Sequence, residues 1–145
     1  MKFLFDTNIL IHYLRETSLS QDIDERFNPF GNDNIPCISV VTAGEIKSFA
    51  IQRKWGMAKL QKMEKSLQEF VVFDIMFDVL INRYAEIDAY SQNLLLGKPL
   101  GKTPRNMGKN DIWIAATASV AQAVLLTTDH DFDHLHQSFL DLQRL

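Results

Sequence analysis

The chain has little of several features that define common protein classes. Cys37 is its only cysteine, so an internal disulfide is excluded, and the run Pro36-Cys37-Ile38-Ser39-Val40 predicts a buried strand position for this thiol. No apolar run approaches the roughly 20 residues that a membrane-spanning helix requires. Asp6 interrupts the apolar N-terminus too early for a signal peptide. We therefore expect a cytoplasmic protein without a membrane segment.

Several sequence motifs of well-known sites are also missing. There is no G-x-x-x-x-G-K-[ST], no G-x-G-x-x-G and no G-x-S-x-G. Residues 129–133 open like an EF-hand loop, but His134 stands where glycine is needed and Leu140 where glutamate is needed. Three histidines lie within residues 130–136 without a companion cysteine cluster, which disfavours structural zinc. Asn8 stands where a D-x-D-x-T phosphatase needs an acid.

The charge of the chain is unevenly distributed. A net charge of −3 disfavours a nucleic-acid partner at first, because phosphate contacts need lysine and arginine. However, residues 46–65 hold six cations against the single acid Glu64, and residues 97–110 hold four cations and no acid. For the first stretch, a solvated helix face is as good an interpretation as a nucleic-acid surface. The second also contains three glycines and two prolines, which predicts a functional loop.

The pattern of apolar residues predicts one α/β domain over residues 1–145. The predicted strands are 2–5, 37–41, 71–75 and 124–127, with 139–142 as a candidate fifth. The predicted helices are 7–14, 42–54, 57–69, 76–93 and 111–123. Because strands alternate with helices, we expect a mainly parallel central sheet, in which ligands bind beyond the carboxyl ends of the strands.

Four acidic residues mark the starts of apolar runs or the ends of predicted strands: Asp6, Glu45, Asp111 and Asp129. Each has a simple explanation as a helix cap, and Thr42-Ala43-Gly44-Glu45 matches the capping box S/T-x-x-E. Four such acids at one edge of a small sheet are harder to attribute to capping alone. Gathered there, they would repel one another without protons or a metal ion, and carboxylates are the ligands that Mg²⁺ and Mn²⁺ prefer.

These residues resemble those of the PIN-domain ribonucleases and, within them, the VapC-type toxins of bacterial toxin–antitoxin modules. The similarity spans nearly the whole chain and rests on four segments, Phe5–Leu10, Thr42–Ile46, Asn110–Ala118 and Leu126–Phe132. The opening Asp6-Thr7-Asn8 alone is weak evidence. All four segments in order, with their acids 39, 66 and 18 residues apart, form a specific pattern.

The resemblance implies an Mg²⁺- or Mn²⁺-dependent endoribonuclease on a compact three-layer α/β/α fold. Its partners would be an RNA substrate, a second copy in a homodimer and a small antitoxin whose C-terminal segment occupies the cleft. Carried over by position, the metal ligands are Asp6, Glu45, Asp111 and Asp129, with Asp131 as the alternative to Asp129. Asn8 and Thr127 would orient carboxylates or water.

Four cations that precede the predicted helix 111–123 are the candidates for holding RNA. Arg105 and Lys109 precede Asp111, with Lys98 and Lys102 behind them. Three alternatives stay open: a PIN-like module that binds RNA or protein without cleavage, a housekeeping PIN nuclease, and an unrelated doubly wound domain whose acids only cap helices.

Overall fold

Five strands form one sheet in the computed structural model, which describes residues 1–145. They are β1 (Lys2–Phe5), β2 (Ile35–Ser39), β3 (Val71–Phe73), β4 (Val124–Thr127) and β5 (Asp141–Arg144). Their spatial order is β3-β2-β1-β4-β5, and every neighbouring pair is parallel. The predicted α/β class with a mainly parallel sheet is therefore confirmed, and the sheet is in fact entirely parallel.

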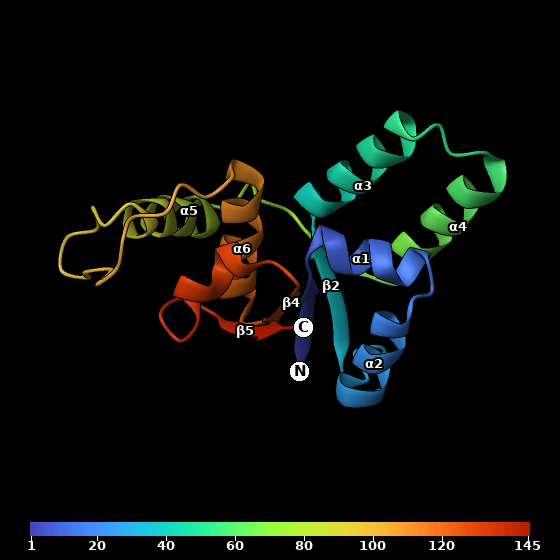
Figure 1. Cartoon of the computed structure of the whole chain (residues 1–145), viewed down its shortest axis with the longest axis horizontal. Helices are drawn as coiled ribbons and strands as arrows, with labels where there is room; N and C mark the ends of the chain where they lie inside the picture. The colour runs from blue at the N-terminus through green and yellow to red at the C-terminus, as the bar shows by residue number, and fades with distance from the viewer.

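Helices cover both faces of this sheet. They are α1 (Thr7–Leu14), α2 (Ser18–Phe27), α3 (Val40–Gln52), α4 (Met57–Leu67), α5 (Asp78–Ser91) and α6 (Lys109–Ala121), with the 3₁₀ helix η1 (His130–Leu135). Figure 1 shows α1 to α4 on one side of the sheet and α5 and α6 on the other, which confirms the three-layer arrangement. No helix combines the length and apolar character that a membrane crossing needs.

The strand order places a switch point beside β1. The chain winds outward from β1 through β2 to β3, then returns across the sheet to form β4 on the other side of β1. The helices on the two sides of this point lie on opposite faces of the sheet, so a crevice opens beyond the carboxyl ends of β1 and β4. Asp6 directly follows β1, and Asp129 lies two residues after the end of β4.

The sheet divides the apolar core into two clusters because successive strand residues point to opposite faces. On β1, Leu4 packs with the α5–α6 layer, whereas Phe3 and Phe5 pack with the α1–α4 layer. Cys37 is buried in the first cluster, as its sequence context predicted, and burial raises the pKa of its thiol to about 12. A thiol with so high a pKa stays protonated and is a poor nucleophile.

Several element boundaries differ from the prediction by about two residues, and one helix was missed. No helix was predicted at Ser18–Phe27, although Thr17 caps α2 by accepting a hydrogen bond from the amide of Ser20. The fifth strand begins at Asp141, two residues later than expected. The capping box was also wrong, because α3 begins earlier, at Val40, and the Ser39 hydroxyl caps it.

Candidate metal centre

The four predicted acids converge at the carboxyl edge of the sheet. Asp6, Glu45, Asp111 and Asp129 line one hollow of about 250 Å³, together with the predicted orienting residue Asn8. They reach it from four elements: the end of β1, the second turn of α3, the first turn of α6 and the segment after β4. The predicted convergence is therefore present.

Asp6 is the most enclosed of these carboxylates, with 5% of its surface exposed. Its Oδ1 accepts a hydrogen bond of 2.7 Å from the amide of Thr7, and its Oδ2 accepts one of 2.8 Å from the hydroxyl of Thr127. The same hydroxyl oxygen accepts the amide of Asp129 at 3.0 Å. Burial raises the pKa of Asp6 despite these bonds. Thr127 thus fixes two of the acidic segments relative to each other.

Thr7 holds Glu45 in a similar way, a role that was not predicted from the sequence. The Thr7 hydroxyl donates to Oε1 of Glu45 at 2.8 Å, and the hydroxyl of the buried Thr42 lies 3.4 Å from the Thr7 hydroxyl. A hydroxyl immediately after a predicted ligand was the available signal. Its partner lies 38 residues away in the chain, so only the fold reveals the pairing.

Asp111 lies at the electrostatic centre of the group. One of its carboxylate oxygens lies within 4.8 Å of one oxygen of Asp129 and one of Asp131. Partial burial raises the pKa of Asp111 to about 6, and the charges of Asp6, Asp129, Glu45 and Asp131 add to that effect. An all-oxygen donor set with unbalanced negative charge fits a hard divalent cation such as Mg²⁺ or Mn²⁺.

Helix capping explains only part of this arrangement. Asp6 caps α1, and Asp129 caps η1 by accepting the amide of Asp131 at 2.9 Å. Glu45 lies inside α3, and Asp111 lies in the first turn of α6, whose cap position is Gly108. Capping alone therefore does not account for Glu45, and for Asp111 the favourable helix dipole is opposed by the surrounding carboxylates.

A family comparison agrees with this geometry. The sequence model of the PIN domain matches residues 3–137. The chain belongs to the PIN-domain family. No curated protein matches the chain.

Solved structures resemble this PIN domain over almost their full length. A chain of VapBC2 from Rickettsia felis, bound to a DNA fragment from the promoter, has a TM-score of 0.76 at 19% identity, and the alignment covers 100% of this chain and 99% of that one. VapBC-1 from nontypeable Haemophilus influenzae has a TM-score of 0.76 at 24% identity, and the alignment covers 99% of this chain and 98% of that one. VapBC-5 from Mycobacterium tuberculosis has a TM-score of 0.68 at 19% identity, and the alignment again covers 99% of this chain and 98% of that one. At these identities the likeness establishes the fold.

The cationic loop of the PIN domain is anchored beside the acids. The amide of Arg105 donates to the carbonyl of Ser91 at 2.7 Å, and its guanidinium reaches the carbonyl of His130 at 3.4 Å. The Ser91 hydroxyl bonds Nε2 of the buried His134 at 2.7 Å and donates to Sδ of Met107 at 3.4 Å. Arg105 is therefore held next to the segment that carries Asp129 and Asp131.

The other predicted RNA-binding cations lie in two kinds of place. Lys102 and Lys109 are exposed and form no ion pair, and Lys109 opens α6 two residues before Asp111. Lys98 differs from the expectation. Its ammonium donates to the carbonyl of Ser138 at 2.7 Å and lies 4.0 Å from the ring centre of Phe139, so it braces the loop.

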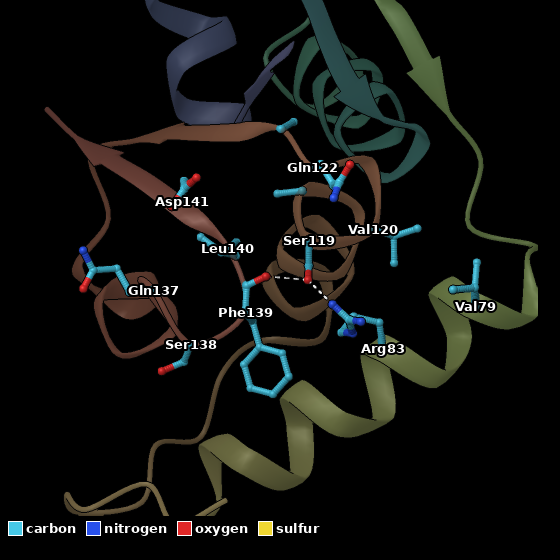
Figure 2. Close-up of a pocket in the computed structure, with 12 residues that line it drawn as sticks. Val79, Arg83, Ser119, Val120, Gln122, Gln137, Ser138, Phe139, Leu140 and Asp141 are labelled. Carbon is cyan, nitrogen blue, oxygen red and sulfur yellow. Dashed lines mark hydrogen bonds between the residues drawn. The ribbon is translucent and has the colours of Figure 1, made fainter. Parts of the chain in front are cut away.

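A larger hollow of about 580 Å³ lies elsewhere in the PIN domain, between α5, the end of α6 and residues 137–141. Figure 2 shows Ser119 at its centre, accepting a hydrogen bond from Arg83 and donating to the carbonyl of Phe139 at 2.6 Å. None of the acids of the candidate metal centre lines it. It lies at the opposite end of α6 from Asp111, so cavity size alone would misidentify the site.

Proposed function

We propose that this PIN domain is an Mg²⁺- or Mn²⁺-dependent endoribonuclease and the toxin of a toxin–antitoxin pair. The observation that carries the proposal is the convergence of four acids from four elements on one hollow, with a fifth, Asp131, beside it. Partial burial and, after it, the repulsion of the other carboxylates raise the pKa of Asp111, and a bound cation would relieve this repulsion. Without a bound cation, the repulsion among these carboxylates destabilises the fold.

The residues divide the work as follows. Asp6, Glu45 and Asp111 would hold the ion, with Asp129 as the fourth ligand, because it lines the hollow, or Asp131 in its place. When bound, the ion would lower the pKa of a coordinated water and offset charge on the scissile phosphate. The hydroxyls of Thr7 and Thr127 keep the carboxylates in place. Asn8, at the wall of the hollow, would orient water.

Cations outside the hollow would hold the substrate. Arg105 faces the acidic segment from the anchored loop, and Lys109 and Lys102 extend the positive charge along it. Lys98 would act indirectly by bracing this loop. RNA as substrate follows from the resemblance of the motif residues to PIN ribonucleases.

The partners of the chain are proposed from its structural neighbours. The solved structures similar to this chain include VapBC complexes, which are toxin–antitoxin systems. By analogy, we propose a small antitoxin that covers the acidic cleft, a homodimeric toxin and a cytoplasmic location.

Cleavage of RNA by the purified protein tests the enzymatic part. We expect Mn²⁺ or Mg²⁺ to support cleavage and EDTA to stop it. Glu45→Gln should lower the rate at least a hundredfold, because the amide cannot supply the charge that holds the ion. The matched control is Glu69→Gln, since Glu69 is exposed and makes no side-chain bond. Equal rates for Glu45→Gln and the control would contradict the proposal, and RNA binding without cleavage would favour a binding module.

Expression in bacteria tests the toxin part separately. We expect growth to stop on expression of the wild-type chain and to recover when the cognate antitoxin is co-expressed. Glu45→Gln should not stop growth. Normal growth with an active purified nuclease would favour a housekeeping enzyme over a toxin.

A further inference from the structure

The acidic hollow is continuous with a groove along α3. This neighbouring recess has a volume of about 530 Å³ and shares Glu45 and Phe49 with the hollow. Its other lining residues are small or polar: Gly44, Ser48, Gln52 and Asn110, with Val41 at one end. A chain-like ligand that enters the acidic hollow therefore has a path along α3.

Aromatic and cationic side chains gather where this path leaves α3. The rings of Phe49 and Trp55 meet edge to face, with their centres 5.8 Å apart. The guanidinium of Arg53 lies 4.9 Å from the centre of the Phe49 ring, and the ammonium of Lys59 lies 5.5 Å from that of Trp55. Both aromatic rings are partly exposed, and both cations are exposed.

Most of the cations within residues 46–65 have no acidic partner. Of the six cations within residues 46–65, only Lys47 and Lys62 form ion pairs, at 3.8 Å and 3.4 Å. Arg53 and Lys59 have no acidic partner. A helix face that only needed to be soluble would not require cations stacked on aromatic rings at the mouth of a groove. Aromatic platforms flanked by cations are how proteins bind unpaired nucleic acid.

We propose that a single-stranded RNA leaves the metal centre along α3, with a base against the side of Phe49 that lines the two hollows and phosphates held by Arg53 and Lys59. This inference rests on the proposed nuclease function and extends it to the residues that position the strand outside the metal centre. The cationic loop around Arg105 lies on the η1 side of the acids, whereas α3 lies on the Glu45 side. The strand would thus be gripped on both sides of the bond to be cut.

Duplex RNA fits this path poorly. Stacking on Phe49 needs an unpaired base whose face is free, and bases inside an A-form helix are already stacked on their neighbours. The surface therefore selects unpaired segments by shape and stacking, with little sequence preference from this contact.

Binding without cleavage provides the first test. Fluorescence anisotropy of a labelled RNA of about 12 unpaired nucleotides is measured in EDTA with the wild type, Phe49→Leu and Arg53→Gln. We expect Phe49→Leu to weaken binding about tenfold with an unchanged salt dependence. Arg53→Gln should weaken binding and also reduce the slope of log K against log salt by about 0.7, since one phosphate contact is lost. A duplex of the same sequence should bind more weakly and respond little to Phe49→Leu.

Arg26→Gln is the matched control. Arg26 lies 4.9 Å from the ring centre of Phe27, the same distance as Arg53 from that of Phe49, but it lies on α2, away from the groove, and pairs with Asp22 at 3.1 Å. It should bind RNA like the wild type. Thermal melting of each variant shows whether the fold is retained, and Arg53→Gln alters only an exposed side chain.

Steady-state cleavage in Mn²⁺ separates this inference from the function on which it rests. We expect both variants to raise KM with little change in kcat, because their contacts hold the substrate away from the reacting bond. If the wild type cleaves RNA and both variants bind and cleave like Arg26→Gln, the path along α3 is wrong while the nuclease stands. If the wild type binds RNA as proposed but cuts none, the nuclease proposal fails. Binding of an acidic peptide in place of RNA, lost in Arg53→Gln, would assign the surface to a protein partner and overturn the inference.

Discussion

Asp111→Asn should make the metal-free protein more stable at pH 8, although it alters the metal centre. In the folded chain the pKa of Asp111 is raised from 3.8 to about 6 by partial burial and by four neighbouring carboxylates. A raised carboxyl pKa means that the folded state binds the proton more tightly than the unfolded state does. Stability is therefore lost as pH rises from 3.8 through about 6, and the loss is complete above that range.

The size of the effect follows from the pKa. A rise from 3.8 to about 6 corresponds to about 3 kcal/mol at most, at about 1.36 kcal/mol for each unit. Asp111 is only partly buried, so solvent screening reduces this to about 1.5 kcal/mol. For a chain of 145 residues, we expect Asn to raise the melting temperature by about 5 °C at pH 8. The gain should shrink at pH 5, where Asp111 is largely protonated.

Thermal melting in EDTA and in Mn²⁺ tests this prediction. At a Mn²⁺ concentration of about 100 times its Kd, the wild type should gain about 2.7 kcal/mol, whereas Asp111→Asn should gain much less, so the order of stability reverses. Asp78→Asn is the matched control, because Asp78 occupies the first turn of α5 but is exposed and does not line the acidic hollow. It should slightly destabilise the fold by weakening the favourable dipole interaction. If Asp111→Asn also destabilises the metal-free protein at pH 8, the repulsion argument is wrong.

Three further substitutions probe the surroundings of the site. Thr127→Val keeps the side-chain shape but removes the buried hydrogen bond to the Asp6 carboxylate; we expect a loss of about 1–3 kcal/mol in urea unfolding and weaker Mn²⁺ binding in calorimetry. Ser91→Ala removes the hydroxyl that bonds Met107 and His134 but keeps the carbonyl that anchors the amide of Arg105, so KM for RNA should rise only slightly in cleavage assays while Mn²⁺ affinity stays unchanged. Asp129→Asn should slow cleavage more than Asp131→Asn, because only Asp129 lines the hollow; the reverse order would identify Asp131 as the fourth ligand.

Local sequence patterns predicted most of the elements that position the acids. The apolar run Lys2–Phe5 ending at Asp6, and the run Val124–Thr127 shortly before Asp129, identified the two central strands. The parallel sheet followed from their alternation with helices, and it gathered the carboxylates as expected. These features depend on residues that are close in the chain, which is why the sequence alone could predict them.

Features that depend on distant partners were missed. The bond from Thr7 to Glu45 spans 38 residues, and the bond from Lys98 to the carbonyl of Ser138 spans 40. Neither partner can be identified from its own neighbours in sequence. The helix α2 was missed for a different reason: most of its residues are polar, and its apolar face consists only of Leu19, Ile23 and Phe27, whose four-residue spacing was overlooked. Its formation depends on the Thr17 cap and on packing against the α1–α4 core.

Direct measurement of Mn²⁺ binding tests the central claim that these carboxylates form a metal centre. Electron paramagnetic resonance of free Mn²⁺ at pH 8 counts the ions bound per chain for the wild type, Asp111→Asn and the control Asp78→Asn. The account predicts saturable binding by the wild type and the control, and at least a tenfold weaker affinity for Asp111→Asn. No bound Mn²⁺ in the wild type, or equal binding by all three proteins, would contradict it.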